Sequence, residues 1–67
     1  MLRINDVYSN QDLEYRILSV LPEQIVWIEV DSTSALPELI LVKDIINLIE
    51  EGVCYIVKDP YESLILQ

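Results

Sequence analysis

A 67-residue chain with a single cysteine cannot close a disulfide bond within itself, so its fold must rest on an apolar core. Hydrophobic residues make up 52% of the sequence, enough for one small domain spanning residues 1–67. Cys54 is expected to be a buried apolar side chain of a protein in the reducing cytoplasm. No apolar run approaches the roughly 20 residues that span a bilayer, so we expect no membrane association.

The residue types that carry most enzyme chemistry are scarce. The chain has no histidine and one glycine, so it offers neither a histidine-based triad nor a glycine-rich phosphate loop. Glu29 and Asp31 leave the same face of a predicted strand, but a catalytic metal site needs a further ligand and a pocket. We therefore expect no catalysis, no metal, no cofactor and no small-molecule substrate in this chain.

The formal net charge of −8 argues against nucleic-acid binding by this domain. Affinity for a phosphate backbone comes from clustered Lys and Arg, whereas Arg3, Arg16, Lys43 and Lys58 are scattered along the sequence. The acidic side chains have two interpretations. They form a solvated surface that keeps an apolar domain in solution, or they dock on a basic partner protein.

Alternating apolar residues predict short strands. Strands are expected at residues 14–20, 25–30, 38–41 and 53–57, after an extended segment at residues 2–8 and a turn at 9–12. Ile4 is the expected inward residue of the extended segment, and Pro22 suits the first central position of the turn between the strands at 14–20 and 25–30.

A helix is predicted over about residues 42–51. Val42, Ile45, Ile46 and Ile49 repeat at helical spacing, with Ile46 expected to be buried, and Gly52 suits the left-handed position that ends a helix. The predicted fold is therefore α+β: a small curled antiparallel sheet of four to five short strands, open or closed into a barrel, with one helix packed across it.

Four side chains are candidates for binding a partner protein: Trp27, Glu29, Glu50 and Glu51. Trp27 is either an interface anchor or part of the core, since tryptophan serves both purposes. Glu50 and Glu51 stand at the end of the predicted helix where the helix dipole disfavours negative charge. They are either ordinary surface carboxylates or part of a docking surface.

Several short segments, taken in order, resemble the extreme N-terminal region of the TnsB-type transposases, relatives of the phage Mu transposase and retroviral integrases. The segments are Ile4-Asn5-Asp6-Val7, Tyr15-Arg16-Ile17-Leu18, Val26-Trp27-Ile28-Glu29-Val30, Leu36-Pro37, Leu48-Ile49-Glu50-Glu51-Gly52 and Lys58-Asp59-Pro60-Tyr61. The resemblance implies an N-terminal architectural or protein-docking domain of a DNA transposase, whose parent protein carries out cut-and-paste transposition, a form of DNA recombination and integration.

The same resemblance places the chemistry elsewhere in the parent protein. In that family a ribonuclease-H-like domain holds an acidic triad that binds a divalent metal such as Mg²⁺, and it lies far downstream of a region like this one. The chain is thus expected to be a fragment of a larger protein, as its apolar end at Leu64-Ile65-Leu66 also suggests. Its expected partners are other transposition proteins, with transposon-end DNA bound through the parent.

Two other functions stay open from the residues alone. One is a self-contained acidic module that masks a basic partner. The other is a DNA-end-binding module, whose affinity would fall steeply with salt and with the changes Arg16→Glu or Lys43→Glu.

Overall fold

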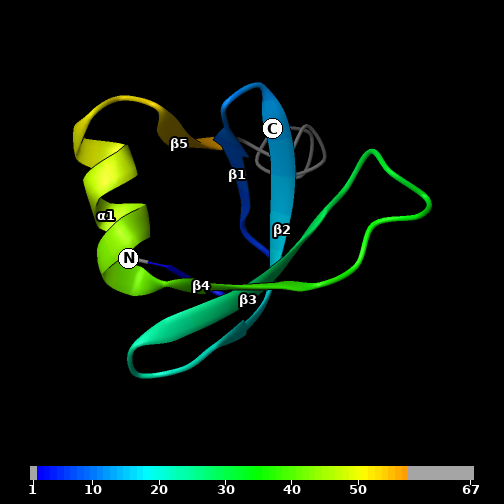
Figure 1. Cartoon of the computed structure of the whole chain (residues 1–67), viewed down its shortest axis with the longest axis horizontal. Helices are drawn as coiled ribbons and strands as arrows, with labels where there is room; N and C mark the ends of the chain where they lie inside the picture. Colours follow the sequence, from blue (N-terminus) through cyan, green and yellow to red (C-terminus); the bar gives the residue numbers. More distant parts are fainter. Residues whose placement is uncertain (1, 58–67) are drawn as a thin grey trace, which may run out of the picture.

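A computed structural model of the chain describes residues 2–57, which form a five-stranded antiparallel sheet and one helix (Figure 1). The elements are β1 (Val7–Asn10), β2 (Leu13–Val20), β3 (Gln24–Glu29), β4 (Glu38–Leu41), α1 (Val42–Glu50) and β5 (Cys54–Val57). The strand order is β4-β3-β2-β1-β5, so α1 connects the two edge strands. The predicted α+β fold is confirmed. The turn expected at 58–61 and the apolar residues 64–66 lie outside the described residues.

The turn between β1 and β2 is tighter than the sequence suggested. Ser9 and Asn10 belong to β1, and the turn consists of Gln11 and Asp12 alone, with φ angles of 53° and 73°. Two consecutive left-handed residues match the right-handed twist of the strands that they join, which is why two-residue hairpins favour them. The predicted turn at 9–12 is therefore present but half as long.

The β2–β3 hairpin follows the prediction closely. Pro22 and Glu23 form its turn, and the Leu21 N–H donates a hydrogen bond to the Gln24 carbonyl at 2.9 Å. Pro22 occupies the first central position, where its fixed φ angle costs nothing. The pairing of β2 with β3 is interrupted by a bulge between Ile17 and Ser19, which bends the hairpin.

The core lies between one face of the sheet and α1. Its fully or nearly buried members are Tyr8, Ile17, Ile25, Trp27, Ile45 and Cys54. Trp27 is 2% exposed and stacks on Tyr15, with ring centroids 4.5 Å apart and ring planes 16° from parallel. The core interpretation of Trp27 and the burial of Cys54 are both confirmed.

The prediction that Ile46 is buried is wrong. Ile45 is completely buried, whereas Ile46 is 45% exposed, and Val42 and Leu48 complete the contact between α1 and the core. The nine-residue helix carries more apolar side chains than it can bury against so small a sheet. One edge of its apolar stripe, made of Ile46 and Ile49, therefore faces outward.

The first segment also differs from the prediction. Ile4 is 58% exposed, because residues 3–6 form a turn in which the Asp6 N–H donates to the Arg3 carbonyl at 3.2 Å. An ion pair between Arg3 Nε and Asp6 Oδ2, at 3.1 Å, spans the same turn. Leu2 packs against the core in place of Ile4, and the strand begins only at Val7.

Gly52 ends α1 as predicted, with a φ angle of 78°. The Gly52 N–H donates to the Ile49 carbonyl and the Val53 N–H to the Leu48 carbonyl, both at 3.0 Å. These two bonds define a Schellman motif, which satisfies helix carbonyls that would otherwise lack partners. The motif turns the chain from the helix into β5.

Replacing Ile45 with alanine is expected to lower the free energy of unfolding by about 2–4 kcal/mol, since the lost side chain leaves a cavity in the core. Ile46→Ala is the matched control, with the same chemical change at an exposed position, and should cost less than about 1 kcal/mol. Urea denaturation followed by circular dichroism measures both. Equal losses for the two variants would contradict the helix orientation described above.

Replacing Gly52 with valine is expected to destabilise the domain by about 1–2 kcal/mol through backbone strain. A Cβ atom at this position would meet nothing within 4 Å, so the left-handed φ angle is the sole source of the cost. Gly52→Asn is the control, because asparagine tolerates this conformation better. An unchanged midpoint of thermal unfolding for Gly52→Val would show that the Schellman motif contributes nothing.

Candidate functional site

The described residues hold no arrangement suited to metal chemistry. Among residues 2–57, no three Cys, Asp or Glu side chains gather where they would bind one ion. Across the same residues, no helix combines the length and the apolar character that crossing a bilayer requires. The remaining candidates are concave apolar regions of the surface, which mark ligand and partner sites.

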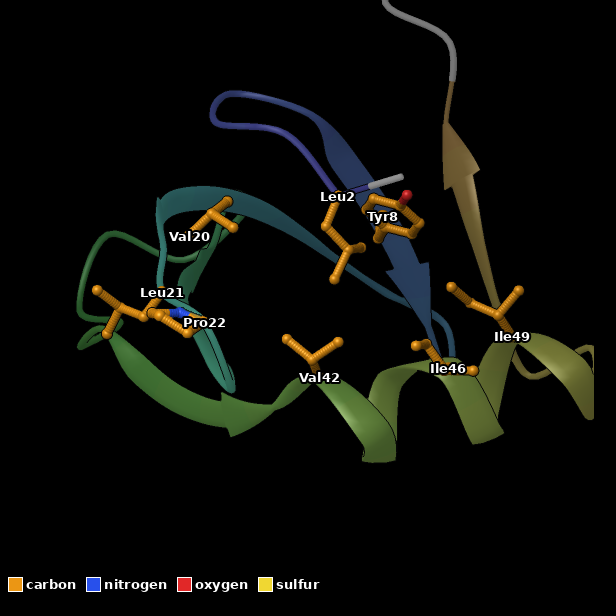
Figure 2. Close-up of a pocket in the computed structure, with 8 residues that line it drawn as sticks. All are labelled: Leu2, Tyr8, Val20, Leu21, Pro22, Val42, Ile46 and Ile49. Atoms are coloured by element: carbon orange, nitrogen blue, oxygen red, sulfur yellow. The ribbon is translucent and has the colours of Figure 1, made fainter.

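An apolar hollow of about 380 Å³ lies between α1 and the end of the β2–β3 hairpin. We call it the α1 groove. Figure 2 shows the side chains that surround it: Leu2, Tyr8, Val20, Leu21, Pro22, Val42, Ile46 and Ile49. Val20, Leu21 and Pro22 form one wall, and the outward edge of the α1 stripe forms the facing wall. The isoleucines that the sheet leaves uncovered thus line a concave surface.

A second hollow of about 420 Å³ adjoins the groove at the start of α1. It shares Pro22, Val42 and Ile46 with the α1 groove and adds Leu41 and two charged residues, Glu23 and Lys43. The second hollow thus places charged side chains beside the apolar lining of the α1 groove.

A backbone hydrogen bond holds the two walls of the groove together. The Val42 N–H at the start of α1 donates to the Glu23 carbonyl in the hairpin turn, at 3.0 Å. Leu41 precedes the helix without a side-chain cap, so the turn supplies a partner for one of the helix N–H groups that have none within the helix. The spacing of hairpin and helix is thereby fixed in the free domain.

Tyr8 gives the groove one polar side chain among otherwise apolar lining residues. Burial raises the pKa of Tyr8 above its ordinary value, and the charge of Asp6 raises it further. Its hydroxyl stays protonated at neutral pH, as that of an ordinary tyrosine does, and the side chain is only 5% exposed. The surface that the groove offers is therefore essentially apolar.

The residues predicted to bind a partner fall into two separate places. Trp27 and Glu29 share the inner face of β3. The pKa of the neighbouring Tyr15 is raised mainly by burial, and further by the charges of Glu38 and Glu29. Glu50 and Glu51 lie at the C-terminal end of α1. Since Trp27 is buried, an interface role would fall to its more exposed neighbours. Partner binding by Glu29, Glu50 and Glu51 stays a prediction.

The sequence profile of the TnsB N-terminal SH3-like domain matches residues 1–60. The chain belongs to this family. The resemblance to TnsB-type transposases is thus confirmed, and the five-stranded antiparallel sheet agrees with an SH3-like fold. A comparison with curated proteins gives no match.

Sequence reasoning did not find the α1 groove of this TnsB-type domain. The wall formed by Val20, Leu21 and Pro22 was assigned to a strand end and a connection, with no part in binding. Two signals were present in the sequence. The α1 stripe has more isoleucines than one contact with a sheet can bury, and Leu21 places a large apolar side chain beside a turn proline.

The domain is expected to lose stability at alkaline pH. Burial raises the pKa of the Cys54 thiol and of the Tyr8 and Tyr15 hydroxyls above their ordinary values of 9.0 and 10.0. The folded state therefore binds these protons more tightly than the unfolded state. The corresponding stability is complete below pH of about 9 and is lost as pH rises through the raised values.

Urea denaturation at a series of pH values tests this expectation. The free energy of unfolding should begin to fall above pH of about 9. Cys54→Ala should remove the part of this fall that occurs at the lowest pH, since the thiol has the lowest ordinary pKa of the three groups. A midpoint that is constant up to pH of about 11 would contradict the burial of all three groups.

Proposed function

We propose that this domain is a non-catalytic docking domain of a TnsB-type transposase, which positions the parent protein by binding another transposition protein during cut-and-paste transposition in the cytoplasm. The observation that carries the proposal is the α1 groove, a preformed apolar hollow on an otherwise strongly acidic domain. Large exposed apolar surfaces on small domains generally mark contacts with other proteins.

The absence of catalysis is supported by the side chains available. The chain has no histidine, and its one cysteine is buried with a raised pKa, so the reactive thiolate is disfavoured. The proposal assigns strand transfer and its divalent metal to the rest of the parent protein; residues 2–57 hold no group of three Cys, Asp or Glu side chains placed to bind an ion.

Direct DNA binding is disfavoured by charge and by the engagement of the basic residues. The chain carries 12 acidic against 4 basic side chains. Arg3 pairs with Asp6, and Arg16 donates to the Asn5 carbonyl at 3.0 Å. Transposon ends are then bound through other parts of the transposase, while this domain contacts protein.

The acidic surface also favours a second candidate function. A domain with a net charge of −8 attracts basic surfaces at long range, so it could mask a basic partner as a self-contained module. This candidate predicts broad, salt-sensitive binding to basic proteins that does not depend on the apolar groove.

Full-length transposase carrying Ile46→Asp tests the proposal. The change places a charge in the α1 groove at an exposed position, so the fold should survive. Transposition in cells is expected to fall by about tenfold or more, whereas strand transfer of pre-cleaved ends by the purified transposase should be unchanged. Leu39→Asp is the control, since Leu39 is 62% exposed on β4 and does not line the groove.

Two results would contradict the proposal. Wild-type transposition with Ile46→Asp would show that the groove is not used. An equal loss of strand transfer by the purified transposase would show that the domain supports the reaction itself rather than docking.

A further inference from the structure

We infer that the α1 groove binds a short segment of a partner protein in which a large apolar side chain is flanked by lysine or arginine. The inference rests on the proposed docking function and adds the chemistry of the bound segment. It comes from three features of the groove: an apolar floor, acidic side chains at its border and a fixed width.

The apolar floor of the groove favours a large apolar side chain in the bound segment. Apart from Tyr8, every residue around the α1 groove is aliphatic, including Val42, Ile46 and Ile49 on the helix side. A hollow of about 380 Å³ lies in the range of pockets that take up a compact apolar group. A buried leucine, methionine or aromatic side chain of the bound segment would release water from both apolar surfaces.

The acidic border of the groove favours basic residues beside that apolar side chain in the bound segment. Glu23 lines the adjoining hollow, and Glu50 stands on α1 one turn after Ile46 and next to Ile49. Lys43 is the basic residue of this region, so carboxylates outnumber ammonium groups around the groove. With a net charge of −8 on the whole chain, both the local and the long-range field favour a basic segment.

The same charge argues against a second copy of the chain as the occupant. Two domains that each carry a net charge of −8 repel one another, and each would bring acidic side chains to the acidic border of the other groove. A basic partner segment removes this repulsion. Because hydrogen bonding between Val42 and Glu23 already fixes the walls, such a segment meets a formed site and little ordering cost is incurred by the domain.

Selection from a random peptide library displayed on phage, with the 67-residue chain immobilised, tests the inference. Selected peptides are expected to share a large aliphatic or aromatic residue within a few positions of Lys or Arg. Synthetic versions of them should bind the wild-type chain in fluorescence anisotropy and lose about tenfold or more in affinity to Ile46→Asp and to Leu21→Asp, which alter facing walls. Leu39→Asp should bind like the wild type.

A charge-reversal pair separates the local charges from the net charge. Glu23→Lys with Glu50→Lys should weaken the selected peptides, whereas Asp31→Lys with Glu38→Lys, which changes the net charge equally at exposed positions away from the groove, should weaken them much less. Equal weakening by both pairs would overturn the assignment of Glu23 and Glu50. Circular dichroism of each variant checks that the fold is retained.

Other outcomes overturn the inference outright. These are enrichment of acidic or uncharged peptides, binding that is insensitive to both groove variants, or concentration-dependent dimerisation that Ile46→Asp abolishes. The docking function fails separately, since it is judged by transposition in cells. Loss of transposition with Ile46→Asp alongside acidic selected peptides would keep docking and reject the basic segment.

Discussion

The packing of Ile45 against the sheet is the contact on which the rest of the domain depends. The chain has no disulfide, and no metal-binding cluster occurs in residues 2–57, so apolar burial must hold strands and helix together. Ile45 is the fully buried residue of α1, and it joins Ile17, Ile25 and Cys54 in the core. One helix side chain thus connects α1 to strands from both halves of the sheet.

The α1 groove follows from the same packing. A short helix that directs Ile45 into the core must direct Ile46, one position later, about 100° around its axis and away from the densest contact. Ile46 and Ile49 then line a hollow that Val20, Leu21 and Pro22, at the end of the β2–β3 hairpin, also line (Figure 2). Such exposure of apolar side chains on a small domain is typical of surfaces that contact other molecules.

The sequence predicted most of the fold and little of the site. Alternation along β2 and β3, the position of Pro22 and the glycine at position 52 each have a local physical cause, so they could be recognised without the structure. The rotation of α1, which buries Ile45 of the predicted stripe and leaves Ile46 exposed, depends on where the sheet edge lies. The groove joins residues some twenty positions apart, Leu21 and Val42 among them, and periodicity carries no information on such a contact.

The place of α1 in the chain has a mechanical consequence. The helix runs directly from β4 into a Schellman turn and then into β5, so it ties together the two edges of the sheet (Figure 1). Because α1 is continuous with both edge strands through the chain, a displacement of the helix acts on both edges of the sheet at once. A partner that contacted α1 would therefore be coupled to both edges.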